Sequence, residues 1–236
     1  MSETGPVPRV AVRAVLVAGF LVAFTALLII VELKWGPVHR FDVRVARSLH
    51  RTELDSPGQA SWWRAVSNVL SPNVLRVLAA LAAVVLWMRQ AREAALFVVV
   101  AMVGAAVLEA LGKALVGRAR PVFADPVAHA TGNAFPSGHA MTSFVAFGVL
   151  AVLAAPRYRA LAIGVGAVAV VLVGFSRIAL GVHYVTDVLG AWLLGAAWLA
   201  ATAWLFDARA GGGGGPLRRR SSRPAERPEP GRPRGR

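Results

Sequence analysis

Three short motifs in this chain bring together residue types that can hold a phosphate group and break its ester bond. Between them they supply three cations, two histidines and one carboxylate. Cations neutralise phosphoryl oxygens, and a histidine can act as a nucleophile or transfer a proton. In chain order, the motifs are Lys113 with Arg120-Pro121, then Pro136-Ser137-Gly138-His139, and then Ser176-Arg177 with His183 and Asp187.

Three basic side chains are the candidate phosphate ligands. A guanidinium group binds phosphate oxygens in pairs, whereas a lysine contributes a compact point charge. Lys113 and Arg120 are seven residues apart, nearly two turns at ~3.6 residues each, so we expect them to share one helix face. Arg177 would reach them from another helix. Arg118, taken alone, is typical of a basic side chain that snorkels at a helix end.

The second motif is expected to open a helix. A helix N-terminus offers free backbone N–H groups and the positive end of a dipole, which together bind anions. Gly138 would leave room for the ligand to approach the backbone, and the Ser137 hydroxyl could donate to a phosphate oxygen. His139 would follow in the first turn.

The third motif places His183 and Asp187 four residues apart, which predicts one turn on the same helix face. A carboxylate there accepts a hydrogen bond from one ring nitrogen, fixes the tautomer and leaves the other nitrogen free to attack. The alternative is metal ligation by the same two residues. Neighbouring cations would repel a divalent ion, so no metal site is expected. Glu109 is expected to pair with Lys113, one turn further along its helix.

Composition indicates a membrane protein with one domain. The 236 residues are 56% hydrophobic and only 16% charged, against ~25% charged residues in an average soluble domain. The length suits a single domain. The chain has no cysteine, which excludes disulfides and thiolate metal sites.

Six apolar segments are predicted to span the membrane, which gives an all-α integral membrane bundle. Small residues such as Gly104 and Gly190 would let the helix backbones approach closely. The predicted organisation is a short cytoplasmic N-terminus (1–9), a six-helix membrane domain (10–207) and a tail (208–236). The six segments lie near Val10–Leu33, Asn73–Met88, Ala94–Gly112, His139–Ala155, Ala160–Phe175 and Thr186–Phe206.

Basic residues favour a cytoplasmic N-terminus, because most of those outside the helices then face the cytoplasm. All three motifs would then lie at the outer face of the membrane, where the third and fifth helices end and the fourth and sixth begin. The outer segment 34–72 opposes this assignment, since it also carries several basic residues. Its residues Phe41, Val45 and Leu49 recur every four positions. This pattern fits either a helix in the interface plane or a loop helix packed on the bundle.

The net charge of +14 does not indicate nucleic-acid binding. The segment 210–236 holds eight arginines against Glu226 and Glu229, and it begins with five glycines. It has too few apolar residues to fold, so we expect a disordered cytoplasmic tail. Its arginines would suit anionic lipid headgroups. No aromatic or fold signature of a nucleic-acid-binding protein accompanies the charge.

The motifs resemble those of the type 2 phosphatidic acid phosphatase superfamily, whose pattern is K-x6-RP, PSGH and SR-x5-H-x3-D. All eleven fixed positions match in order and spacing. The resemblance implies a metal-independent membrane lipid phosphatase without a cofactor. It implies that His183 is the nucleophile that forms a phosphohistidine, that Asp187 orients it, and that His139 protonates the leaving group. Phosphoryl oxygens would be held by Lys113, Arg120, Ser137, Gly138 and Arg177.

The resemblance leaves the lipid open. Its candidates are polyprenyl (undecaprenyl) diphosphate, phosphatidate, phosphatidylglycerol phosphate and diacylglycerol pyrophosphate. The alanine, valine and arginine bias suggests a GC-rich bacterium, which places polyprenyl diphosphate first and the protein in the plasma membrane. Two other functions remain open, a phosphotransferase that uses the same site and a non-enzymatic lipid-binding protein. A vanadium-dependent haloperoxidase shares the motifs, but six apolar helices do not suit that soluble class.

Overall fold

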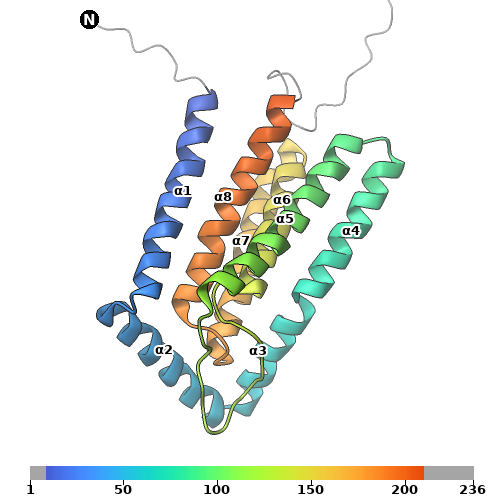
Figure 1. Ribbon diagram of the computed structural model, residues 1–236. Coiled ribbons are helices and arrows are strands. Elements are labelled where there is room, and N and C mark those ends of the chain that lie inside the picture. Colours follow the sequence, from blue (N-terminus) through green and yellow to red (C-terminus); the bar gives the residue numbers. More distant parts are fainter. Residues whose placement is uncertain (1–8, 210–236) are drawn as a thin grey trace, which may run out of the picture.

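The computed structural model describes residues 9–209, which form eight helices and no β-strand (Figure 1). Most of the expected cytoplasmic N-terminus and almost all of the arginine-rich tail lie outside the described residues. The helices are α1 (Arg9–Glu32), α2 (Gly36–Asp55), α3 (Pro57–Val69), α4 (Pro72–Met88), α5 (Arg92–Val116), α6 (Gly138–Leu153), α7 (Pro156–Ala179) and α8 (Val185–Arg209).

The six predicted spanning segments correspond to α1 and α4–α8, and every boundary lies within four residues of the expected one. Five stretches of the described chain are long and apolar enough to cross a membrane, whereas α6 is a shorter apolar helix. The residues after Pro156, expected as a turn, form the first turn of α7, because proline is tolerated at the start of a helix. The five stretches are Ala11–Glu32, Pro57–Met88, Arg92–Val116, Pro156–Ala179 and Val185–Asp207.

The segment between α1 and α4 is helical. Helices α2 and α3 cross one end of the bundle, beside the loop that joins α5 to α6 (Figure 1). Of the three expected apolar positions of α2, Phe41 is exposed, whereas Val45 and Leu49 are partly buried and pack against the core. Asp42, Ala46, His50 and Glu53 are buried as well. The helix therefore packs against the bundle through a partly polar face.

Small residues let the helices approach closely, as expected. A Cβ atom on Gly104 of α5 would lie 2.0 Å from a ring carbon of Trp198 on α8. The indole N–H of Trp198 donates to the Ala101 carbonyl at 2.9 Å. A Cβ atom on Gly190 would similarly collide with the Phe135 ring. The two glycines therefore allow close packing. At Gly104, α5 packs against α8, and at Gly190, α8 packs against Phe135 of the loop that carries the second motif.

The buried core lies mainly between α5, α6 and α8, and includes Phe97, Met141 and Val145. Helix α1 contacts α8 along one side (Figure 1), and about half of its apolar side chains are exposed. An apolar surface of this kind suits a lipid environment, where hydrocarbon covers it.

Candidate active site

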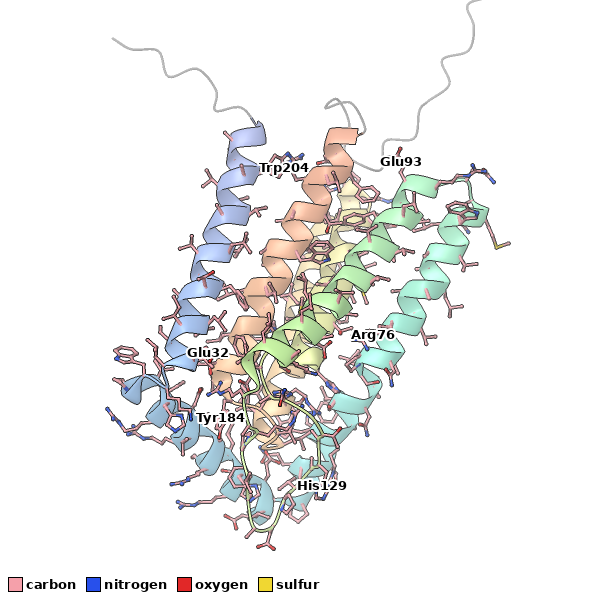
Figure 2. The ribbon with its side chains drawn as sticks, viewed as in Figure 1. Glu32, Arg76, Glu93, His129, Tyr184 and Trp204 are labelled. Atoms are coloured by element: carbon pink, nitrogen blue, oxygen red, sulfur yellow. The ribbon has the colours of Figure 1, made fainter. Side chains whose placement is uncertain are left out.

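The three motifs meet at the end of the bundle where α2 and α3 lie. Helices α5 and α7 end there, and α6 and α8 begin there (Figure 1). Figure 2 shows Tyr184 and His129 at this end, whereas Glu93 and Trp204 mark the opposite end. The antiparallel run of the helices therefore gathers residues that are far apart in the sequence.

His183 lies just before α8 rather than on it, which corrects the expectation of a shared helix face. Gly181 has a positive φ of 69°, which favours glycine and turns the chain after α7. Asp187 then accepts the backbone N–H of Tyr184 at 2.8 Å, which leaves the first turn of the helix to start at Val185. The Asp187 Oδ2 atom still lies 3.3 Å from His183 Nδ1. The expected pair is therefore present with a different backbone geometry.

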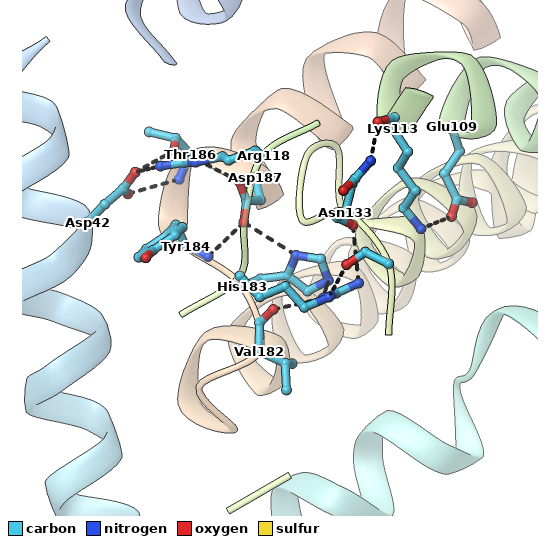
Figure 3. Close-up of polar contacts among 12 residues, drawn as sticks. Asp42, Glu109, Lys113, Arg118, Asn133, Val182, His183, Tyr184, Thr186 and Asp187 are labelled. Atoms are coloured by element: carbon cyan, nitrogen blue, oxygen red, sulfur yellow. Dashed lines mark hydrogen bonds and ion pairs between the residues drawn. The ribbon is translucent and has the colours of Figure 1, made fainter. Parts of the chain in front are cut away.

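Arg120 fixes the tautomer of His183. Its Nη1 lies 2.9 Å from His183 Nε2 (Figure 3). A guanidinium group only donates hydrogen bonds, so Nε2 must accept and carries a lone pair. The ring proton is then on Nδ1, where Asp187 accepts it. In this tautomer the free lone pair of the ring is on Nε2, the nitrogen that faces Arg120.

The expectation that Arg120 shares a helix face with Lys113 is wrong. Helix α5 ends at Val116, and Gly117 takes the left-handed conformation that commonly ends helices. Arg120 lies in the following loop, where its guanidinium donates to four backbone carbonyls. Among these is Val182, the residue before the histidine, at 2.8 Å. The loop therefore positions Arg120 against His183 directly.

Arg118 is the main residue that the sequence interpretation missed. Its guanidinium lies 2.6 Å from Asp187 Oδ1 and 2.8 Å from Asp42 Oδ2, and it also donates to Thr186 at 2.6 Å (Figure 3). Asp42 accepts the Thr186 backbone N–H as well. Arg118 is therefore not a snorkelling side chain. It joins the α2 helix to the carboxylate behind His183.

The sequence carried only a weak signal for this network. Arg118 and Arg120 are separated by one residue in an extended loop, so their side chains are free to diverge. Arg120 reaches His183, and Arg118 reaches Asp42 and Asp187. Asp42 comes from a segment 76 residues earlier, and that long-range contact had no motif to reveal it.

Glu109 forms two charged pairs, one with Lys113 and one with Arg76. The Lys113 ammonium lies 2.7 Å from Glu109 Oε1, as the spacing predicted, and Glu109 Oε2 lies 3.0 Å from Arg76 on α4. Arg76 was not expected at the site. Figure 2 shows it on α4, on the side that faces the bundle. A Cβ atom on Gly138 would lie 2.2 Å from Glu109 Oε1. Gly138 thus makes room for this carboxylate as well as for a ligand.

Two predicted phosphate ligands carry buried polar atoms without a hydrogen-bond partner. The Ser137 Oγ atom and the Arg177 Nε atom are both buried and unpaired. Ser137 stands at the N-cap of α6, but its side chain makes no capping bond. Arg177 uses Nη1 to donate to Ser67 on α3. Buried donors are seldom left unpaired, so these two atoms suit a bound anion.

His139 lies among the same cations. Its ring interacts electrostatically with Arg177, Lys113 and Arg120, and also with His183. It is partly buried, in the first turn of α6. The structure thus brings the eight predicted site residues to one end of the bundle. A hollow of about 280 Å³ opens beside them and is lined by Arg120, Phe123 and Val182, among others.

Burial sets the protonation of His183. It lies almost fully inside the protein, and desolvation lowers the pKa of His183 to about 4. The value of about 4 is the net result, in which Asp187 raises the pKa and Arg120 and Arg177 lower it. The ring is neutral at pH 7. Among the described residues, no group of three or more His, Asp or Glu side chains could hold a metal ion.

Comparisons with known proteins agree with the motifs. Phosphatidylglycerophosphatase B of Bacillus subtilis (strain 168) is 39% identical over 89 residues, which cover 35% of this chain and 43% of that protein. The undecaprenyl-diphosphatase of Sulfolobus acidocaldarius is 32% identical over 120 residues, which cover 48% of this chain and 56% of that protein. The chain thus spans about half the length of the curated relatives it matches.

The fold is also shared with a solved structure. A crystal structure of a transmembrane PAP2 type phosphatidylglycerolphosphate phosphatase from Bacillus subtilis superposes with a TM-score of 0.71. The alignment covers 83% of this chain and 97% of that one at 24% sequence identity. The sequence model of the PAP2 superfamily matches residues 93–210, which contain all three motifs. The chain belongs to the PAP2 superfamily.

Proposed function

We propose that this integral membrane protein hydrolyses the phosphate ester or diphosphate of a lipid through a phosphohistidine on His183, without a metal ion. The observation that carries the proposal is the pair of unpaired buried atoms, Ser137 Oγ and Arg177 Nε, beside a histidine held in the nucleophilic tautomer. The activities named for its relatives, phosphatidylglycerophosphatase B and undecaprenyl-diphosphatase, support the same chemistry.

In the first step, Nε2 of His183 attacks phosphorus. The new P–N bond takes the lone pair of Nε2, and the bond from phosphorus to the leaving oxygen breaks with its electron pair. His139 protonates that oxygen, so the alcohol or phosphate leaves without a full negative charge. Arg120 transfers its Nη1 donor from Nε2 to a phosphoryl oxygen, because the two acceptors compete for one group. Fixed donors of this kind supply most of the stabilisation in phosphoryl transfer.

In the second step, water replaces the histidine. His139, now neutral, takes a proton from water, and the hydroxide attacks phosphorus. The P–N bond breaks, its electron pair returns to Nε2, and inorganic phosphate leaves. The phosphorylated ring of His183 is cationic, and Asp187 stabilises it through Nδ1. The cations of the site supply the charge that a divalent ion supplies in other phosphatases.

Arg118 and Asp42 hold Asp187 in place as positioning residues. Asp187 and Asp42 are both fully buried, and a buried carboxylate needs a compensating charge. Arg118 supplies it to both at once. Arg118 therefore holds the Asp187 carboxylate in the direction of His183 Nδ1.

We further propose six spanning helices, with α6 as a short one, and an active site that faces the extracytoplasmic side of a bacterial plasma membrane. The motifs read a phosphate group, so the choice of lipid rests on the relatives and on composition. Polyprenyl diphosphate and phosphatidylglycerol phosphate are the two substrates to test first, with phosphatidate as the third. The site residues bind phosphoryl oxygens and leave the lipid chain to the bilayer.

The experiment is phosphate release by purified protein in detergent with EDTA present, on these three lipids side by side. Release by the natural sequence and none by His183→Ala is the expected result. His129→Ala is the matched control, because His129 is an exposed histidine of the loop between α5 and α6. Quenching with denaturant at alkaline pH during turnover of substrate labelled in the transferred phosphate should trap an alkali-stable, acid-labile label on the protein.

Three outcomes would count against the proposal. Stimulation by magnesium after EDTA treatment would contradict metal independence. A phosphorylated acceptor in place of free phosphate would indicate a phosphotransferase. No release from any lipid by a folded preparation would favour a lipid-binding protein without catalysis.

A further inference from the structure

Helix α2 carries a stripe of four arginines along one face. Arg40, Arg44, Arg47 and Arg51 follow the spacing i, i+4, i+7 and i+11, which keeps side chains on one side of a helix. All four are exposed. We call this set the arginine stripe. Figure 2 shows long side chains projecting from α2 away from the bundle.

The opposite side of α2 fixes its orientation. Asp42 accepts hydrogen bonds from Thr186 and Arg118, and Ala46 is buried below it. The His50 ring stacks on Phe123 with centroids 3.8 Å apart. These contacts lock the rotation of the helix, so the arginine stripe is held outward by the fold.

Within residues 9–209, Asp55 is the acidic residue that lines the same hollow as the stripe, and no ion pair joins it to a stripe arginine. None of its four guanidinium groups takes part in an ion pair or a hydrogen bond between described residues. The stripe lines a hollow of about 820 Å³, together with His39 and Asp55. Four like charges one turn apart repel one another, so a bound anion would stabilise this arrangement.

The position of α2 puts the stripe at the membrane surface. The apolar stretch Ala11–Glu32 ends four residues before Gly36, and α4, the next helix that runs along the bundle, starts at Pro72 after α2 and α3 have crossed its end (Figure 1). A helix between the ends of two spanning stretches lies at the depth of the headgroups. Trp35 and Trp62, which flank it, are both more than half exposed. Exposed tryptophans are typical of this zone.

We propose that the arginine stripe is a docking surface for anionic phospholipid headgroups of the leaflet at which the active site opens. Guanidinium groups bind phosphate oxygens in pairs, and clustered basic residues near a bilayer are attracted to anionic lipids. This role also accounts for the basic residues of segment 34–72, which oppose the orientation favoured by the other loops. The proposal concerns lipid binding and does not depend on catalysis.

The test is lipid binding by the full chain in detergent, measured by native mass spectrometry during titration with phosphatidylglycerol or phosphatidylcholine. The variant carries all four substitutions Arg40→Gln, Arg44→Gln, Arg47→Gln and Arg51→Gln. We expect its affinity for phosphatidylglycerol to fall by about tenfold or more, because each arginine contributes to the attraction. Affinity for phosphatidylcholine should not change, and the difference between the two lipids should shrink at high salt.

Two matched variants make the result decisive. Replacing the four stripe arginines by lysine keeps the charge and should retain most of the preference for phosphatidylglycerol, which separates charge from folding. The substitutions Arg89→Gln, Arg92→Gln, Arg157→Gln and Arg159→Gln remove the same charge from exposed positions at the opposite end of the bundle. Unchanged phosphatidylglycerol binding in the stripe variant, or an equal loss in this control, would overturn the proposal.

Discussion

Arg118 lies 2.6 Å from the Oδ1 atom of Asp187, and the other oxygen of that carboxylate faces His183. The two contacts use different oxygens, so the guanidinium does not compete with the imidazole. Asp42 holds the far side of Arg118 at 2.8 Å. His183 is thus supported by a chain of charges that runs outward to α2.

Replacing Arg118 by glutamine tests this chain. Asp187 would lose its compensating charge and its fixed direction, so we expect kcat to fall about tenfold to hundredfold, as for other residues that orient a catalytic ligand. The Michaelis constant should change little, because the guanidinium of Arg118 is already occupied by Asp42, Thr186 and Asp187. Steady-state kinetics on the preferred lipid phosphate measures both constants.

The control for Arg118 is Arg159→Gln, which removes an exposed arginine far from the site. Arg118→Lys should recover part of kcat, because an ammonium can still pair with one carboxylate. A rise in the Michaelis constant with unchanged kcat would show that Arg118 binds substrate instead. Asp42→Asn should follow the same pattern with a smaller loss, since Arg118 keeps its contact with Asp187.

The pH dependence of the reaction should reflect the lowered pKa of His183. Attack requires the neutral ring, and burial brings the pKa of His183 to about 4, so protonation of this residue should limit kcat/KM only near and below that pH. An acid limb near pH 6.5, the value of an ordinary histidine, would contradict this protonation scheme.

Stability should depend on pH in the same region. His183 binds a proton near pH 6.5 when the chain is unfolded, but only near pH 4 in the folded protein. Between these values the unfolded state holds more protons, so the contribution is present above pH 6.5 and is lost as the pH falls toward 4. In thermal unfolding between pH 7 and 5, His183→Phe should be less sensitive to pH than the natural sequence.

The motifs made most of the site predictable, because chemistry constrains both their residue types and their spacing. His139, His183 and Asp187 lie together with the cations, as expected. The helices were equally predictable from the sequence, since apolar length is a property of each segment alone. The backbone conformation around the motifs could not be predicted, because Gly117 and Gly181 end helices through positive φ angles that spacing does not reveal.

Long-range charges were harder still. Arg118 and Arg120 are alike in type and nearly adjacent, and only the fold sends one to Asp42 and the other to His183. The role of α2 likewise depended on a polar contact, because Asp42 is fully buried beside the partly buried Val45 and Leu49. Such partners come from distant segments, and no local pattern encodes them.

Vanadate should test the two unpaired donors. Its trigonal-bipyramidal form resembles phosphorus during transfer, so it should inhibit the enzyme at the same site. Ser137→Ala removes one of the buried unpaired atoms, and Arg177→Lys removes the Nε donor while keeping the charge. Each should weaken vanadate inhibition by about a hundredfold, at the low end of the range for loss of a single donor to a transition state. Ser222→Ala, a serine of the tail, is the control. Equal inhibition of all variants would show that these atoms do not contact the anion.

The contact between Gly138 and Glu109 provides a last prediction. A methyl group at position 138 would lie 2.2 Å from Glu109 Oε1, so Gly138→Ala should push the carboxylate away and disturb Lys113, which it holds. We expect a large loss of phosphate release, while Glu109→Gln alone should leave the enzyme largely active. Combining Gly138→Ala with Glu109→Ala removes the collision and should restore part of the lost rate. If the double variant is no better than Gly138→Ala, the glycine is needed for close approach of the phosphate itself, and Glu109 is not the reason for it.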